Sequence, residues 1–173
     1  MLQPPLRGCA RRRPRRRPAG RRTRPRPSAQ AALADAQGRQ VGTVTLTRFA
    51  HGVLIHGALD GLPPGWHGFH IHETGACTPN FAAAGGHFAG AGAKHGLEAD
   101  HMHVGDLPNI WVGADGKTGF EFVTHLVTLD DGPAGLLKQG GTAFVVHAQP
   151  DDYTGQPAGN AGDRIACGVI KKS

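Results

Sequence analysis

The chain has 173 residues, a length that suggests a single domain, and a formal net charge of +6. Residues 1–28 hold eleven arginines and no acidic residue, which leaves 8 basic against 13 acidic side chains, a net charge near −5, in the remainder. No segment reaches the ~18 consecutive apolar residues of a membrane-spanning helix, so the sequence predicts no membrane span.

Residues 1–30 form the first predicted region, a basic arm. Mutual repulsion among its arginines and its repeated prolines oppose a packed core, which predicts disorder. The arm contains no apolar segment of the kind found in a secretory signal peptide. Such a segment could be a targeting peptide, a nucleic-acid-binding tail, or translation from a start codon upstream of the natural one. All three interpretations stay open, and residues 31–173 are predicted to form the folded domain.

The remainder of the chain has the pattern of an all-β protein. In 41–48 the residues Val41, Thr43, Thr45 and Thr47 alternate, which predicts that they share one face of a strand. Further short apolar or β-branched segments recur between Gly, Pro and Asp turn residues, at 53–59, 65–72, 109–113, 118–123 and 142–147. Several short strands of this kind indicate a β-sandwich or barrel.

Two long segments, 73–106 and 148–166, are rich in glycine and lack the strand pattern. Loops of this length inside a compact domain are usually either functional or disordered. Both contain chemically reactive side chains, so we expect them to be functional.

The pair His70 and His72 ends the strand predicted at 65–72. Residues i and i+2 of a strand point to the same face, so both imidazoles could reach one metal ion. An isolated pair with this spacing is more often a surface feature. His147 ends another predicted strand and is a further candidate for the same ion, although a lone histidine there is more often a hydrogen-bonded structural residue.

A second set of candidates lies in the glycine-rich 73–106 segment. His87, His95 and His103 follow one another at eight-residue steps, and Asp106 comes three residues later. Three imidazoles and one carboxylate complete a tetrahedral shell for Zn²⁺, and glycine lets the backbone bend around the ion. The alternative is a histidine-rich loop with incidental spacing.

The three cysteines are Cys9 in the arm and Cys77 and Cys167 in the predicted domain. This distribution suggests one disulfide and one remaining thiol. Two reduced, buried thiols are the alternative for the domain.

Taken together, six motifs resemble the copper/zinc superoxide dismutase family, and specifically its bacterial members. They occur in the family's order over roughly residues 40–171: Gly68-Phe69-His70-Ile71-His72-Glu73, Gly86-His87-Phe88, Lys94-His95-Gly96, His103-Val104-Gly105-Asp106-Leu107, Val145-Val146-His147 and the segment 159–170. The resemblance implies a Greek-key β-sandwich or flattened barrel of about eight antiparallel strands.

The resemblance also implies one copper and one zinc ion per chain and a role for each site residue. Copper would be bound by His70, His72, His87 and His147. Zinc would be bound by His87, His95, His103 and Asp106, so that His87 bridges the two ions and takes part in catalysis as a proton carrier. Asp151 would join His70 to His95, Arg164 would guide the superoxide anion, and Cys77 would form a disulfide with Cys167.

The resemblance implies superoxide as the substrate and leaves a homodimer open. Bacterial members of the family are typically exported, which implies a periplasmic or otherwise exported protein, and a disulfide would agree with an oxidising compartment.

The chain departs from the family pattern in the 73–106 segment. Ala89-Gly90 follows the bridging histidine where Asx-Pro is usual, and Leu97 stands where a proline usually follows Gly96. Both changes are expected to loosen the predicted zinc loop. His101 competes with His103 as a ligand, and we favour His103 because it keeps its spacing from Asp106.

Two other functions compete with a dismutase. A non-catalytic copper carrier on the same fold would be expected to lose copper ligands or the arginine, whereas this chain keeps all of them. A nucleic-acid-binding protein would depend on the arm, which lacks the aromatic residues that stack on bases, so its binding is expected to be non-specific.

Overall fold

The computed structural model describes residues 28–97 and 100–173. The described chain is all-β apart from one short 3₁₀ helix, η1 (Phe81–Ala84). The strands, in chain order, are β1 (Ser28–Asp35), β2 (Gln40–Phe49), β3 (Gly52–Leu59), β4 (Gly65–His67), β5 (Phe69–His72), β6 (Ile110–Val112), β7 (Thr118–Thr124), β8 (Ala143–His147), β9 (Arg164–Val169) and β10 (Lys171–Lys172).

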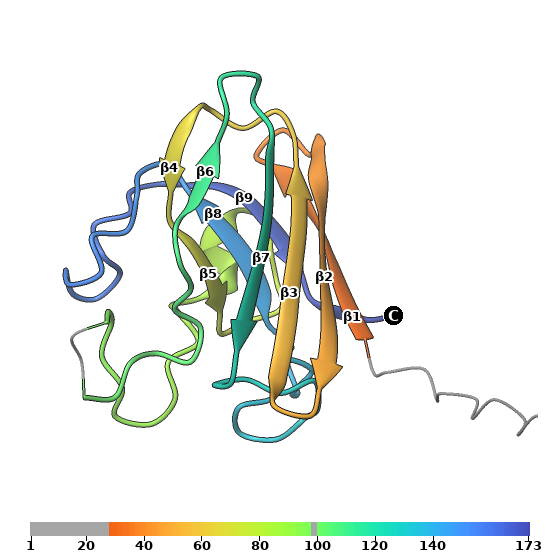
Figure 1. Ribbon diagram of the computed structural model, residues 1–173, viewed down its shortest axis with the longest axis vertical. Coiled ribbons are helices and arrows are strands. Elements are labelled where there is room, and N and C mark those ends of the chain that lie inside the picture. Colours follow the sequence, from red (N-terminus) through yellow and green to blue (C-terminus); the bar gives the residue numbers. More distant parts are fainter. Residues whose placement is uncertain (1–27, 98–99) are drawn as a thin grey trace, which may run out of the picture.

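Eight of these strands form one antiparallel sheet in the order β5-β8-β9-β1-β2-β3-β7, with β10 paired to β1, while β4 and β6 form a separate pair. The sheet curls, so that β8 and β9 cross behind β3 and β7 in Figure 1. Phe69 of β5 packs against Phe120 of β7 and Phe144 of β8, with ring centroids 5.0 Å apart in both pairs. The two ends of the sheet therefore enclose one core, as the predicted sandwich requires.

The first strand includes the last three residues of the predicted arm. Strand β1 begins at Ser28, whose carbonyl accepts a hydrogen bond from the backbone N–H of Ser173. Ala29, Ala31 and Leu33 alternate toward the core. Residues 28–30 therefore belong to the sheet, because their backbone is paired with β2 and β10. The other residues of the predicted arm, 1–27, lie outside the described part of the chain.

The alternation predicted for residues 41–48, which lie in β2, is wrong at Val41. The pairing of β1 with β2 shifts register between Leu33, which lies opposite Gly42, and Ala34, which lies opposite Gln40. The shift leaves Val41 as an extra residue, and a bulge of this kind reverses which residues face inward. Val41 is therefore buried together with Val44 and Leu46 rather than aligned with the threonines.

The predicted strand 65–72 is divided at Gly68. Residues before it form β4 and pair with β6, whereas residues after it form β5 and pair with β8. A Cβ atom at Gly68 would lie 2.9 Å from the Cβ of Ala161, so the close approach of the second long loop requires glycine here. All four residues of β5 are buried.

Of the two long connections, 148–163 and the later described part of 73–109 lie at the left of Figure 1, whereas η1 lies behind β8. The 148–163 connection is shorter than predicted, because β9 starts at Arg164 and continues the sheet beside β8. Within the described residues no helix is both long enough and apolar enough to cross a bilayer.

Core packing should depend on Leu46, which is fully buried. Replacing Leu46 with alanine is expected to lower the free energy of unfolding of the metal-free protein by about 2–5 kcal/mol, because the lost methyl groups leave a cavity. Val123→Ala is the control, since Val123 is 63% exposed, and its effect should stay within about 1 kcal/mol. Urea unfolding measures both, and equal effects would contradict this description of the core.

Candidate metal centre

Four histidines meet at one end of the sheet. His70 and His72 lie on β5, His147 ends β8, and His87 enters from the 73–109 loop. One ring nitrogen from each lies within 4.8 Å of the corresponding nitrogen of every other, and all four residues are buried. The alternation of β5 explains half of this group, because Phe69 and Ile71 belong to the hydrophobic core while His70 and His72 do not.

A second group adjoins the first and shares His87 with it. It consists of His87, His95, His103 and Asp106, again buried and with one ligand atom each within 4.8 Å of the others. The structure thus brings together each of the two sets that the sequence suggested. It places His103 in the second group, whereas His101 is exposed and contributes its backbone carbonyl to a hydrogen bond with Lys94.

The protons on His72 and His147 show that the first group fits a cation. Nδ1 of His72 lies 3.0 Å from the carbonyl of Gly85, and Nδ1 of His147 lies 3.2 Å from that of Gly162. A carbonyl only accepts, so each Nδ1 carries the proton and each Nε2 has a lone pair. The two Nε2 atoms nevertheless lie 3.4 Å apart. A metal ion between them would turn this repulsion into two bonds.

Three buried ring nitrogens point to the same conclusion. Nδ1 of His70, Nε2 of His87 and Nδ1 of His103 make no hydrogen bond within the described residues, although the last of these lies 3.4 Å from Oδ1 of Asp106. Burying a polar atom without a partner costs about 1–3 kcal/mol, so a native structure usually supplies one. His70 and His87 direct these atoms into the first group, and His103 directs its own into the second.

The second group surrounds one carboxylate oxygen. Oδ1 of Asp106 lies 2.9 Å from Nδ1 of His87, 3.1 Å from Nδ1 of His95 and 3.4 Å from Nδ1 of His103. Ligands of a tetrahedral zinc ion with bonds of 2.0–2.1 Å are separated by roughly 3.3 Å, which agrees with this spacing. Three nitrogens and one oxygen are also a donor set that zinc prefers.

Asp106 is held in its charged form. Burial raises the pKa of its carboxyl group, but hydrogen bonds from His87 and from the backbone N–H of Gly96, together with the charges of the neighbouring imidazoles, lower the pKa to about 2. The carboxylate is therefore ready to bind a cation at neutral pH.

Asp151 connects the two groups from behind. Nε2 of His70 donates to its Oδ2 over 2.7 Å, and Nε2 of His95 donates to its Oδ1 over 2.9 Å. Because a metal-binding imidazole is oriented by the acceptor of its other N–H, one carboxylate fixes one histidine of each group. Burial raises the pKa of Asp151, but these hydrogen bonds and that from the backbone N–H of Tyr153 lower it overall.

Sequence reasoning missed residues whose side chains hold the site in place, among them His67 and Asn109. His67 is buried between two carbonyls, with Nδ1 2.7 Å from His147 O and Nε2 2.8 Å from Pro63 O. Asn109 donates to the carbonyl of Asp151 and accepts from its backbone N–H, both over 2.8 Å. Only the position of His67, three residues before His70 in the same predicted strand, could have drawn attention to it.

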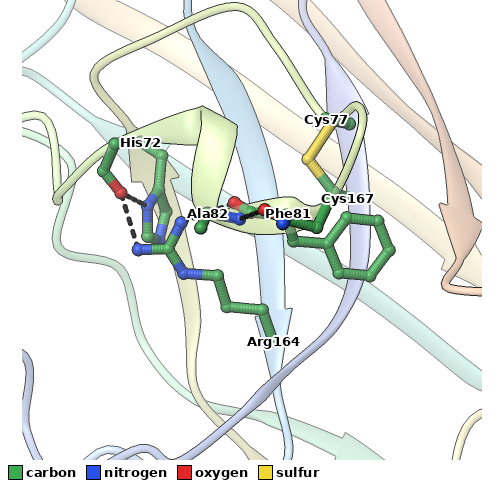
Figure 2. The surroundings of a disulfide bond; sticks show 8 residues. His72, Cys77, Phe81, Ala82, Arg164 and Cys167 are labelled. Atoms are coloured by element: carbon green, nitrogen blue, oxygen red, sulfur yellow. Dashed lines mark hydrogen bonds between the residues drawn. A yellow bond between two sulfur atoms is a disulfide. The ribbon is translucent and has the colours of Figure 1, made fainter.

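Arg164 lies beside the first group and is oriented by the disulfide loop. Its guanidinium donates to the carbonyls of Phe81 and Gly85, each over 2.6 Å, and the Gly85 carbonyl also accepts from His72. Figure 2 shows the side chain of Arg164 directed toward η1 and His72. The positive charge of Arg164 is one of the influences that lower the pKa of His72 and of His147.

The expected disulfide is present. Cys77, four residues before η1, is bonded to Cys167 of β9, and their Cα atoms are 5.8 Å apart. The bond joins the loop that holds η1 to the strand that begins with Arg164, as Figure 2 shows. A disulfide is consistent with an oxidising compartment.

The fold and these two groups define an all-β metalloprotein in which one imidazole is shared between neighbouring metal sites. A family model described as copper/zinc superoxide dismutase (SODC) matches residues 40–170. The chain is 48% identical over 149 residues to a Cu-Zn superoxide dismutase of Caulobacter vibrioides, covering 83% of this chain and 86% of that protein. It is 46% identical over 147 residues to a second such protein from Aquifex aeolicus, covering 83% and 86%.

Among solved structures, the chain is similar to a double mutant of a SOD-like protein from Bacillus subtilis. The TM-score is 0.77 at 40% identity, and the match covers 81% of this chain and 95% of that one. This chain belongs to the copper/zinc superoxide dismutase family.

Burial of the first group makes the metal-free protein sensitive to acid. Burial lowers the pKa of His70 to about 4, of His72 to about 2 and of His147 to about 3, whereas an ordinary histidine has a pKa of 6.5. Between pH 6.5 and about 4 the unfolded chain therefore binds more protons than the folded one. Its free energy of unfolding should fall as the pH decreases through this window, by up to about 1.4 kcal/mol per pH unit for each histidine.

Urea unfolding of the metal-free protein at a series of pH values measures this slope. Replacing the exposed His51 with glutamine is the control and should leave the slope unchanged. A stability that is constant between pH 6.5 and 4.5 would show that the three buried imidazoles take up protons without unfolding.

Proposed function

We propose that this chain is a superoxide dismutase, which converts two superoxide ions and two protons into dioxygen and hydrogen peroxide. Copper is bound by His70, His72, His87 and His147, and zinc by His87, His95, His103 and Asp106, one ion of each per chain. The observation that carries the proposal is the position of His87, whose Nε2 is unpartnered in the first group while its Nδ1 faces Asp106 in the second.

The donor sets suit the two metals. Imidazole nitrogens accommodate copper in both of its oxidation states, so a bound copper ion would supply the electron transfer, whereas zinc is redox-inert and would support His87 from the other side. The residues around the sites then have to orient the ligands, attract the anion and deliver protons.

His87 is the proposed proton carrier. Its Nδ1 faces Asp106, so Nε2, which faces the first group, is the ring atom that could hold a proton whenever copper is not bound to it. A proton held there can be transferred to the second superoxide ion as peroxide forms, which is a general-acid role. One of the two protons that the reaction consumes would come from this atom, and the other from solvent.

Arg164 is the proposed guide for the anion. Residues after Ser28 carry a net charge near −5, with 8 basic against 13 acidic side chains, so the domain as a whole repels superoxide. Local attraction is therefore required. The guanidinium of Arg164 lies close to His72, because both side chains donate hydrogen bonds to the carbonyl of Gly85. Fields of this kind raise association rates and weaken with added salt.

The alternative function is a copper carrier on the same fold. A carrier has no need of the shared His87 or of a guanidinium held beside the first group. Both are present in this chain, which favours the enzyme. We further propose that residues 28–173 form the dismutase domain and that the protein is periplasmic or otherwise exported, with which the Cys77–Cys167 disulfide is consistent.

The direct test is metal analysis together with an assay. The protein reconstituted with both metals is expected to contain one copper and one zinc ion per chain, to show nitrogen hyperfine structure in its copper EPR spectrum, and to remove superoxide catalytically. His87→Gln should reduce the rate strongly while copper remains bound by His70, His72 and His147. Full metal loading of the unchanged protein without catalytic turnover would instead identify a carrier.

The role of Arg164 has its own salt-dependent signature. Arg164→Gln is expected to lower kcat/KM by about tenfold or more at low ionic strength and to flatten its salt dependence, because the local positive charge is lost. Arg164→Lys should keep part of both. Arg39→Gln is the control, since Arg39 is exposed and paired with Asp35 on the surface. An unchanged salt dependence in Arg164→Gln would rule out steering by this residue.

A further inference from the structure

The side chain of Gln156 is paired with the backbone of His95. Its Nε2 donates to the carbonyl of His95 over 2.7 Å, and its Oε1 accepts from the backbone N–H of His95 over 3.1 Å. One amide side chain thus satisfies both backbone groups of a single residue, as a neighbouring strand would. Gln156 lies in the 148–163 loop, sixty-one residues from its partner along the chain.

These two bonds complete the fixation of His95. Its ring is already held by the hydrogen bond from Nε2 to Asp151, while Nδ1 directs its lone pair toward Oδ1 of Asp106. Asp151 and Gln156 belong to the same loop, which therefore holds both parts of His95. Asp151 sets the direction of the imidazole ring, and Gln156 sets the position of the backbone. His95 is 1% exposed, whereas Gln156 itself lies at the surface.

The sequence around His95 makes such support necessary. Gly92 and Gly96 lie on either side of His95, and because glycine permits many backbone conformations the local sequence does little to fix this segment. The backbone N–H of Leu97 also bonds to the 148–163 loop, through the carbonyl of Tyr153. The rigidity that the local sequence lacks is thus supplied from the other loop.

We propose that Gln156 is a positioning residue for the zinc site, and that it determines how tightly zinc is held by fixing the backbone of His95. This proposal rests on the assignment of His95 as a zinc ligand under the proposed function. Gln156 contributes no ligand and lies outside both metal-binding groups. Residues that orient a metal ligand typically change metal affinity by 10–100-fold when they are replaced.

Gln156→Glu is the most selective variant. It keeps the length of the side chain and the acceptor for the N–H of His95, but it puts a carboxylate oxygen against the carbonyl of His95. Gln156→Asn is the second variant, which keeps the amide neutral but is too short to reach. Gln149→Glu is the matched control, because it makes the same change in the same loop at an exposed residue whose hydrogen bonds to Gly68 and Ala161 come from its backbone.

Zinc affinity is measured by competition with a chromophoric chelator, and the geometry of the site by the visible spectrum of the protein with cobalt in place of zinc. Both Gln156 variants are expected to bind zinc about 10–100-fold more weakly and to show altered cobalt bands, while Gln149→Glu binds zinc as the unchanged protein does. The copper EPR spectrum should stay the same in all of them, since His70, His72 and His147 keep their contacts.

Unchanged zinc affinity in both Gln156 variants would overturn the proposal. Equal weakening of zinc and copper binding together with a lower melting temperature would also overturn it, because Gln156 would then support the fold in general. If the unchanged protein itself binds no zinc, the proposed function fails instead, and the two failures are thereby distinguished.

Discussion

The structure depends on keeping buried lone pairs directed at one another. Nε2 of His72 and Nε2 of His147 lie 3.4 Å apart, and Nδ1 of His95, whose Nε2 proton is donated to Asp151, lies 3.1 Å from Oδ1 of Asp106. Without a cation these contacts are repulsive, so the surrounding protein has to hold them. The curled sheet does this for the first group by burying β5 and β8 completely, which leaves His70, His72 and His147 no room to turn away.

The second group depends on the loops rather than on the sheet. His87, His95 and His103 lie in a glycine-rich connection, and the residues that orient them come from elsewhere. Asp151 bonds to His95 and to His70, so that the two groups share a support as well as a ligand. A Cβ atom on Gly159 would lie 1.8 Å from Oδ1 of Asp151, and the loop therefore closes over this carboxylate only because glycine stands there.

The disulfide fixes the surroundings of the first group in a similar way. It holds the loop of η1 against β9, and the carbonyls of Phe81 and Gly85 in turn bind Arg164. The carbonyl of Gly85 connects this arrangement directly to His72. The carbonyl oxygen of Gly85 thus fixes the position of Arg164, the proposed anion guide, relative to His72, a proposed copper ligand. Arg164 matters because the net charge of the domain would otherwise repel an anion.

The sequence by itself determined the all-β class, most of the strands and the two groups of candidate ligands, because turn residues, alternation and short histidine motifs are local signals. It did not reveal that Val41 faces the core, since the bulge that turns it inward arises from pairing with β1. Nor did it reveal His67, Asn109 or Gln156, whose partners are backbone atoms of His147, Asp151 and His95. Backbone atoms are the same in every residue and leave no pattern in a sequence, so only the tertiary structure decided which side chains hold the ligands in place.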